Sequence, residues 1–215
     1  DLKWNDDLRT TLSGGVTEFA LSPDEDELAV VMRGEVYVFS FEDGEAGRSQ
    51  RVTETAARER DVAWMPDGET LLFASDRDGN YDLYAVRSAE DGERKLSKAV
   101  KRAVTRLTDS PEDDLDPMPA PDGKTVAYKN GNDFLWLMGA DGASQRQLLP
   151  EAEILHADWS PDSRWIAVSR TTMGHKEDIF IVPAAGGEEV NATLHPNDDF
   201  QPRWTDDGKR LSFAS

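Results

Sequence analysis

Oxygen-bearing side chains gather in one short stretch, SDRDGNYDLY, at residues 75–84. Asp76, Asp78, Asn80 and Asp82 stand at alternate positions, and carboxylate and amide oxygens are the ligands that a hard cation such as calcium prefers. A calcium loop of the helix–loop–helix type also needs Gly at its sixth position and Glu at its twelfth. Counted from Asp76, neither residue is found there. We therefore interpret the stretch as a structural turn, because its Asp-Gly pair is a strong hairpin signal.

Nucleophiles and acid–base groups give no catalytic pattern. The three histidines, His156, His175 and His195, show no ligand spacing such as H-E-x-x-H. No G-x-S-x-G motif of a serine nucleophile occurs. Ser22 and Ser160 precede Pro-Asp in a repeated turn, which already accounts for them. Because Cys is absent, there is no thiolate zinc site and no disulfide. We expect this chain to carry no catalytic residue, metal or cofactor, and not to be an enzyme by itself.

The charge balance excludes one class of partner. With 43 Asp and Glu against 24 Lys and Arg, the 215 residues carry a net charge of −19. A surface this acidic repels the phosphate backbone, so nucleic acid is excluded as a partner. The hydrophobic fraction of 38% suffices for a packed core, and no apolar run reaches the length of a membrane span. The compartment stays open between cytoplasm and periplasm.

A repeated pattern places these residues on a scaffold. Each of five copies has a short apolar segment, a Pro-Asp-Gly type turn and an apolar run rich in β-formers. Successive turns are 43, 55, 40 and 45 residues apart. Repeats of roughly 40 to 50 residues with several short strands are typical of propeller blades. The turn of each copy is anchored at Pro23, Pro66, Pro121, Pro161 and Asp206.

Two further strands complete each copy. The third strand begins at an acidic residue, and the fourth is more polar; the acids are Glu35, Asp82, Asp133 and Asp178. The insertion at 95–107, KLSKAVKRAVTRL, has the nearest approach to a helical pattern and is a candidate for a short helix. Trp64, Trp159 and Trp204 share one repeat position, which predicts packing between neighbouring blades.

The predicted fold is all-β: a single-domain β-propeller of five blades, each with four antiparallel strands. The blades are expected at about 16–58, 59–112, 113–152 and 153–198, with 199–215 plus 1–15 forming the last. N- and C-terminal strands would close this last blade and remove the open edges of the ring. In the alternative, the chain is an open piece of a larger ring, or it pairs with another copy through shared blades.

Several segments carry a family resemblance. ALSPDEDELAVV, WMPDGETLLFASDRDGNYDLY and WSPDSRWIAVS resemble the Pro-Asp repeats of TolB-like, WD40-like propellers over nearly the whole chain. The segment starting at Asp7, DLRTTLSGGVTEFALSPDEDELAVVMRGEVYVFS, and EDIFIVPAAGGEEVNATLHPNDDFQPRW resemble propeller segments of tricorn-type serine peptidases. The resemblance implies a propeller fragment that filters or guides peptides near a separate peptidase core. The family's catalytic Ser and His belong to that core, and no segment here matches it.

Propeller ligands usually bind on one face of the ring, at the mouth of the channel. Because the first strand of each blade lines the channel, the loops before it supply the candidate contacts. These are Arg60, Asp61, Asp114, Asp116, His156, Asp198, Asp199 and Gln201. A rim this acidic favours cations or basic peptides.

These observations predict a non-catalytic binding, gating or scaffold module whose partner is a peptide or protein. The first alternative is a TolB-like periplasmic scaffold for protein interactions. The second is a propeller hydrolase or lyase that uses carboxylates at the channel mouth, which must stand at a defined separation to act.

Overall fold

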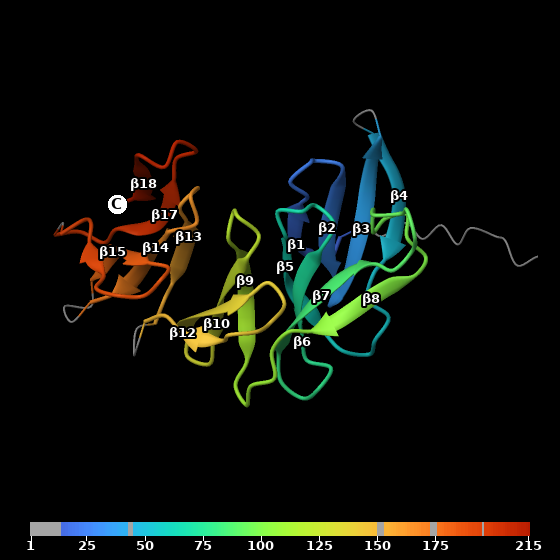
Figure 1. Ribbon diagram of the computed structural model, residues 1–215, viewed down its shortest axis with the longest axis horizontal. Coiled ribbons are helices and arrows are strands. Elements are labelled where there is room, and N and C mark those ends of the chain that lie inside the picture. Colours follow the sequence, from blue (N-terminus) through green and yellow to red (C-terminus); the bar gives the residue numbers. More distant parts are fainter. Residues whose placement is uncertain (1–13, 43–44, 150–152, 173–175, 195) are drawn as a thin grey trace, which may run out of the picture.

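The computed structural model describes residues 14–42, 45–149, 153–172, 176–194 and 196–215, and these form strands and turns without any helix. The strands make five antiparallel sheets, numbered in chain order (Figure 1). Sheet 1 comprises β1 (Val16–Leu21), β2 (Glu27–Met32), β3 (Glu35–Glu42) and β4 (Glu45–Arg51). Sheet 2 comprises β5 (Glu59–Trp64), β6 (Leu71–Ser75), β7 (Asp82–Ser88) and β8 (Arg102–Arg106). Sheet 3 comprises β9 (Asp114–Pro119), β10 (Thr125–Asn130), β11 (Phe134–Gly139) and β12 (Arg146–Gln147). Sheet 4 comprises β13 (His156–Trp159), β14 (Trp165–Thr171), β15 (Glu177–Pro183) and β16 (Val190–Asn191). Sheet 5 comprises β17 (Phe200–Trp204) and β18 (Leu211–Ala214).

The sheets follow one another along an arc, with sheet 1 and sheet 5 at its two ends (Figure 1). The first strands β1, β5 and β9 lie side by side, as do β13 and β17. Among the described residues, β9 and β13 approach each other less closely, although the Trp159 indole on β13 reaches the Met118 carbonyl on β9. The predicted strands of the last blade at 1–13 lie outside the described residues. The part of the chain that is described contains no apolar helix of membrane-spanning length.

The repeated turn has one geometry in all five sheets. The residue before each anchor donates its N–H to a carbonyl five residues on, at 2.8–3.0 Å, as Ser22 does to Glu27 and Met65 to Thr70. Two residues after each anchor, the backbone has a positive φ of 60–69°. Glycine supplies that conformation in three copies, and Glu25 and Ser163 adopt it in the other two. The sequence repeat therefore encodes the hairpin between the first and second strands.

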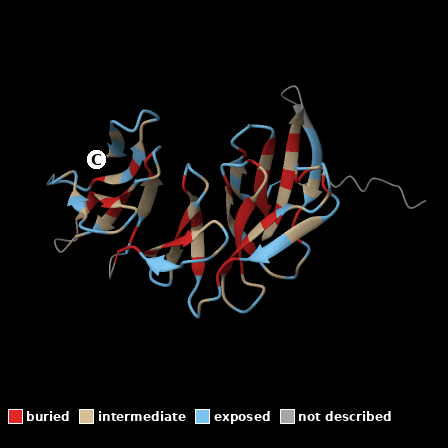
Figure 2. Ribbon diagram, viewed as in Figure 1, coloured by how far each residue is buried: buried red, intermediate tan, exposed pale blue. Residues whose placement is uncertain are grey.

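Sheets 1 to 4 pack face to face through three apolar clusters, visible as buried stripes in Figure 2. Alternate residues of a strand point to opposite faces, and the second strands use this in a regular way. Phe73 faces sheet 1 and Ala74 faces sheet 3, while Tyr128 faces sheet 2 and Ala127 faces sheet 4. The larger side chain thus points to the preceding sheet, and the smaller one leaves room for the next.

Tryptophans at the shared repeat position lie between sheets, as the sequence predicts. Trp64 and Trp159 are buried, and their indole N–H groups donate to the carbonyls of Ala20 and Met118 in the preceding sheets, at 3.0 and 2.9 Å. Trp204 holds the same position in sheet 5 and is half-buried.

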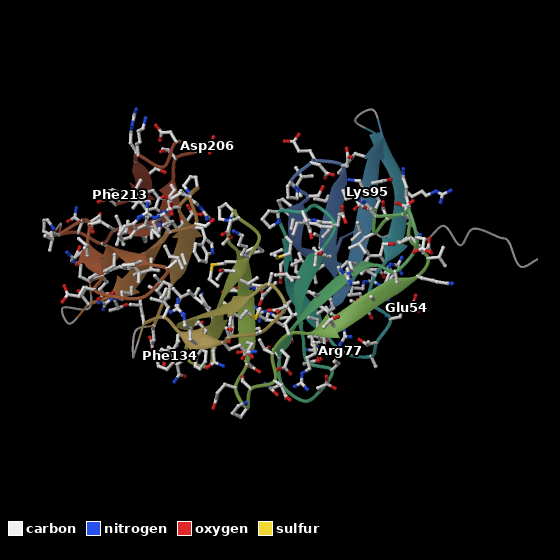
Figure 3. All side chains as sticks on the ribbon, viewed as in Figure 1. Glu54, Arg77, Lys95, Phe134, Asp206 and Phe213 are labelled. Atoms are coloured by element: carbon white, nitrogen blue, oxygen red, sulfur yellow. The ribbon has the colours of Figure 1, made fainter. Side chains whose placement is uncertain are left out.

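The insertion between β7 and β8 is not helical: residues 89–101 form turns. Its Leu96 is fully buried in the cluster between sheets 1 and 2. The buried carboxylate of Glu27 accepts the N–H groups of Leu96 and Ser97. Lys95, labelled in Figure 3, pairs with Asp24 in the turn between β1 and β2. The insertion therefore holds the first two sheets together.

Candidate functional site

The inner strands share a position, five residues before each turn anchor, that carries polar side chains. Its occupants are Glu18, Asp61, Asp116, His156 and Gln201. The register of pairing shifts beside this position in β1, β5, β9 and β17. Asp61, Asp116 and Gln201 have φ values of 54°, 50° and 53°, an uncommon conformation for these residues. A β-bulge redirects side chains, and bulges are frequent next to functional sites.

Hydrogen bonds link these bulges from sheet to sheet. The N–H of Asp61 donates to Glu18 Oε2 at 2.5 Å, and the N–H of Asp116 donates to Asp61 Oδ2 at 3.2 Å. The series is interrupted at β13, which pairs regularly with β14 from His156 to Trp159. The interruption coincides with the wider spacing between β9 and β13 in the described part of the chain.

A cavity of about 280 Å³ opens at this interruption. It is lined from four sheets by Asp61, Val62, Asp116, Pro117, Met118, Lys129, Leu155, His156, Ala157 and Arg203. The structure therefore brings together three of the predicted site residues: Asp61, Asp116 and His156. Arg60 borders them, since its Nε lies 3.0 Å from Asp61 Oδ1.

The acidic side of the cavity is densely paired. The Asp61 side chain is only 7% exposed, and burial, followed by the neighbouring Asp116 carboxylate, raises the pKa of Asp61. Burial likewise raises the pKa of Glu18, although the Asp61 N–H stabilises its ionised form. Arg60 and Lys129 offset these charges, and Lys129 Nζ lies 2.9 Å from Asp116 Oδ2.

The opposite side carries cationic and ionisable groups. Arg203 on β17 pairs with Asp158 Oδ1 at 3.0 Å, and its side chain is 70% exposed. His156 on β13 contacts Ser169 Oγ through Nδ1 at 3.2 Å. The rim is therefore of mixed charge, unlike the acidic rim expected from sequence.

The other predicted residues lie elsewhere. Asp114 is buried within sheet 3, where Asn130 Nδ2 donates to it at 2.8 Å. Asp198 Oδ1 accepts the N–H of Glu177, and Asp199 is fully buried at the start of sheet 5. Gln201 forms the bulge of β17. His175 and His195 lie outside the described residues.

Three residues of the candidate site escaped the sequence reasoning: Lys129 and Arg203, which line the cavity, and Glu18, which binds the Asp61 N–H. Glu18 could have been found by extending the shared repeat position to the first copy. Lys129 lies on a second strand and Arg203 beyond the bulge, so their place at the cavity depends on how the sheets are packed.

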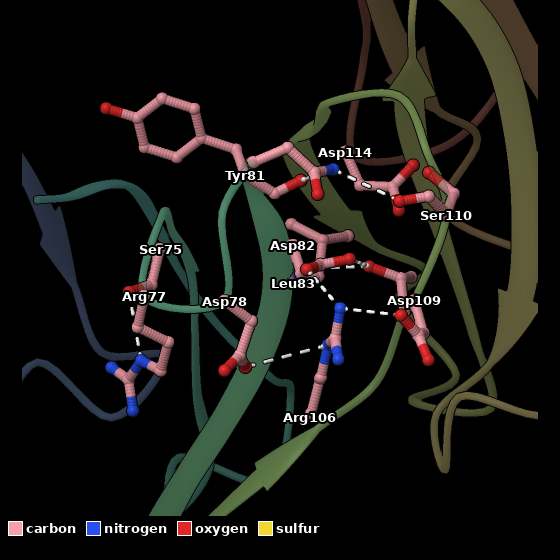
Figure 4. A network of polar contacts seen from close by, with 12 residues as sticks. Ser75, Arg77, Asp78, Tyr81, Asp82, Leu83, Arg106, Asp109, Ser110 and Asp114 are labelled. Atoms are coloured by element: carbon pink, nitrogen blue, oxygen red, sulfur yellow. Dashed lines mark hydrogen bonds and ion pairs between the residues drawn. The ribbon is translucent and has the colours of Figure 1, made fainter. Parts of the chain in front are cut away.

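Within the stretch at 75–84, residues 76–81 form the turn between β6 and β7, as predicted (Figure 4). Asp78 Oδ2 accepts the Tyr84 hydroxyl at 2.5 Å, and buried Asp82 pairs with Arg106 at 2.6 Å. Asp76 Oδ1 accepts the N–H of Arg58 at 2.7 Å. Within the described ranges, no group of three or more His, Asp or Glu residues is placed to hold a metal ion.

Comparison with known proteins identifies the fold. No family model matches the chain. It is 28% identical to the "Uncharacterized peptidase YuxL" of Bacillus subtilis over 173 residues, covering 79% of this chain and 23% of the relative. It is also 28% identical to the Tol-Pal system protein TolB of Anaeromyxobacter dehalogenans over 131 residues, covering 59% of this chain and 27% of TolB. The chain thus spans about a quarter of the length of these relatives.

Solved structures extend the likeness. A protein described as TolB from Agrobacterium tumefaciens matches 92% of this chain and 69% of its own, with a TM-score of 0.68 and 22% identity. The tricorn protease matches 95% of this chain and 20% of its own, with a TM-score of 0.69 and 16% identity. An oligogalacturonate lyase in complex with manganese matches 94% and 59%, with a TM-score of 0.68 and 18% identity. The chain has the TolB-like β-propeller fold. The predicted resemblance to TolB and tricorn propellers is confirmed at the level of fold.

Proposed function

We propose that this chain is a non-catalytic β-propeller module that binds an extended polypeptide segment at the cavity between β5, β9, β13 and β17. The observation that carries the proposal is the cavity itself. Its volume of about 280 Å³, its apolar walls from Val62, Met118 and Leu155, and the charged groups between them suit a site where apolar contact gives affinity and polar groups give orientation.

Two biological settings fit such a module. One is a gating or scaffold role beside the peptidase core of a tricorn-like enzyme, and the other is a TolB-like periplasmic scaffold. A peptidase core next to this segment in the parent gene would favour the first setting. A secretion signal upstream would favour the second.

Blocking the cavity tests the proposal. Leu155 is 40% exposed and lines the cavity, so Leu155→Trp should fill its mouth without disturbing the core. Val190→Trp, on the outer strand of the same sheet and 61% exposed, is the matched control. We expect the wild type and Val190→Trp to bind the same members of a peptide library, and Leu155→Trp to lose them at least tenfold. Equal binding by all three proteins would place the binding surface elsewhere.

A second candidate function, carboxylate chemistry at the channel mouth, is favoured by one observation. Burial raises the pKa values of Glu18 and Asp61, which share a hydrogen bond at the channel, and perturbed carboxyl groups in clefts are candidates for acid–base roles. The oligogalacturonate lyase of similar fold suggests a substrate for the assay. Lyase activity on oligogalacturonate with manganese, lost in Asp61→Asn, would support this function; no turnover by the wild type would exclude it for that substrate.

We also propose that the chain closes into five blades. The blades would span about 16–58, 59–112, 113–152 and 153–198, with 199–215 completed by 1–15. The open faces of the two end sheets support closure. Phe19 and Leu21, paired with Val30 and Leu28, leave the large-residue face of sheet 1 without a neighbouring sheet. Ser212 and Ala214, the smaller residues of β18, lie by strand alternation on the face opposite Leu211, which pairs with Trp204.

A further inference from the structure

We propose that the cavity recognises a carboxylate group of its polypeptide ligand, and that Arg203 and His156 bind that group. The inference rests on the proposed function and specifies the chemistry of the ligand. The two residues come from neighbouring strands, β17 and β13, and line the same cavity. A ligand carboxylate could accept hydrogen bonds from both.

Asp158 orients the Arg203 side chain but uses only part of its hydrogen-bond donors. Its Nη1 donates to Asp158 Oδ1 at 3.0 Å, and the N–H of Trp204 fixes Asp158 through Oδ2 at 2.7 Å. A guanidinium has five N–H donors, and the side chain is 70% exposed. The remaining donors can bind a carboxylate in the paired geometry that suits arginine.

His156 is held through one ring nitrogen. Nδ1 lies 3.2 Å from the hydroxyl of Ser169, which is fully buried. Within the described structure Nε2 has no hydrogen-bond partner, and the side chain is 43% exposed. Contact at Nδ1 fixes the ring and leaves Nε2 as the nitrogen available to a ligand in the cavity.

Glu177 lies close to the nitrogen of His156 that contacts Ser169. Glu177 Oε1 is buried without a hydrogen bond and lies 3.9 Å from His156 Nδ1. A protonated imidazole could donate to Ser169 or Glu177 on one side and to a ligand carboxylate on the other. The charged groups facing it from the packed elements are Asp158 on β13, Glu177 on β15, Arg203 on β17, Asp116 on β9 and Lys129 on β10.

The acidic residues offer less to a basic ligand. Asp61 accepts from Arg60 and from the N–H of Asp116, and Asp116 Oδ2 is paired with Lys129. Lys129 is also occupied, since it donates to the carbonyl of Leu155 at 3.3 Å and is 14% exposed. Asp116 keeps one oxygen without a bond in the described structure, but most of the uncommitted capacity of the cavity is donor capacity on Arg203 and His156, which favours an acidic group over the basic peptide expected from sequence.

Short capped peptides can test the assignment on the whole chain. The probes are acetyl-Ala-Glu-Ala-amide, acetyl-Ala-Ala-Ala with a free carboxylate, and acetyl-Ala-Lys-Ala-amide. Binding is followed by the imidazole NMR signal of His156, assigned with His156→Gln. We expect one or both acidic probes to shift this signal. Their affinity should be higher at about pH 6 than at about pH 8, because histidines change charge in this range. The stronger of the two distinguishes a side-chain carboxylate from a chain terminus.

Variants separate the site from general charge effects. Arg203→Gln should weaken the acidic probe about tenfold or more, whereas Arg164→Gln, an exposed arginine away from the cavity, should not. In His156→Gln, the affinity for the acidic probe should no longer depend on pH. Because this variant lacks the imidazole signal, binding is followed by the NMR signals of backbone amides near Arg203. A shift of His156 by the lysine probe alone would overturn the carboxylate assignment but leave the proposed function standing. If no probe shifts His156 while Leu155→Trp still abolishes library binding, only this inference fails; if Leu155→Trp has no effect either, both fail.

Discussion

At the residue scale, several acidic side chains are buried within the sheets, and their charges must be compensated there. Asp82 begins the third strand of sheet 2, is fully buried, and pairs with Arg106 at 2.6 Å. Burial raises the pKa of Asp82, and Arg106 opposes the rise (Figure 4). A buried ion pair adds little compared with an apolar pair, but removing one partner leaves a charge without compensation.

Removal of the Arg106 charge should therefore be costly. We expect Arg106→Gln to lower the free energy of unfolding at pH 7 by about 3 kcal/mol in urea denaturation. The folded-state pKa of Asp82 is already raised and would rise further, so the loss should grow as pH increases through that pKa and shrink in acid, where Asp82 is protonated. Arg87→Gln, at an exposed position on the same sheet, serves as control. A loss that stays constant across pH would show that Arg106 acts by packing alone.

At the element scale, the large-to-small alternation of the second strands sets how closely the sheets approach. Ala127 is fully buried and contacts the cluster between sheets 3 and 4. We expect Ala127→Leu to lower the free energy of unfolding by about 1–3 kcal/mol, because the added methylene groups overpack that interface. Thr105→Leu on exposed β8 should change it by less than about 0.5 kcal/mol. Equal effects of the two substitutions would mean that the interface can expand.

The elements also mark what the sequence could predict. Turns, strands and inter-sheet tryptophans were predictable because each depends on local chemistry that recurs at fixed spacing, such as Pro-Asp-Gly before an apolar run. The turns of the insertion were not predictable from local sequence, because the burial of Leu96 between sheets 1 and 2 overrides the helical pattern of the segment. The cavity was predictable only in part. Asp61 and His156 hold a repeated position, but the bulge at one and its absence at the other depend on contacts between sheets.

At the scale of the whole molecule, the arc leaves one apolar face of sheet 1 in need of a neighbour. Phe19 is 73% exposed and Leu21 is 49% exposed, although both hold positions that in sheet 2 are occupied by Val62 and Trp64 and are covered by the preceding sheet. Such a face attracts another apolar surface. Either the free face of sheet 5 of the same chain covers this face, or the corresponding face of sheet 1 in a second copy covers it.

Phe19→Ala distinguishes a covered face from an open one. If the face is covered, the substitution should lower the free energy of unfolding by about 3 kcal/mol or more, as for a buried aromatic. If the arc stays open, it should have almost no effect, like the control Val100→Ala at a position that is 78% exposed. Light scattering then assigns the covering sheet. We expect a mass near the 23.9 kDa of one chain together with a costly Phe19→Ala, which means a ring closed by sheet 5 of the same molecule. A larger mass that falls to that of one chain in Phe19→Ala would instead mean that two copies associate through this face. The cavity would then lie within an assembly.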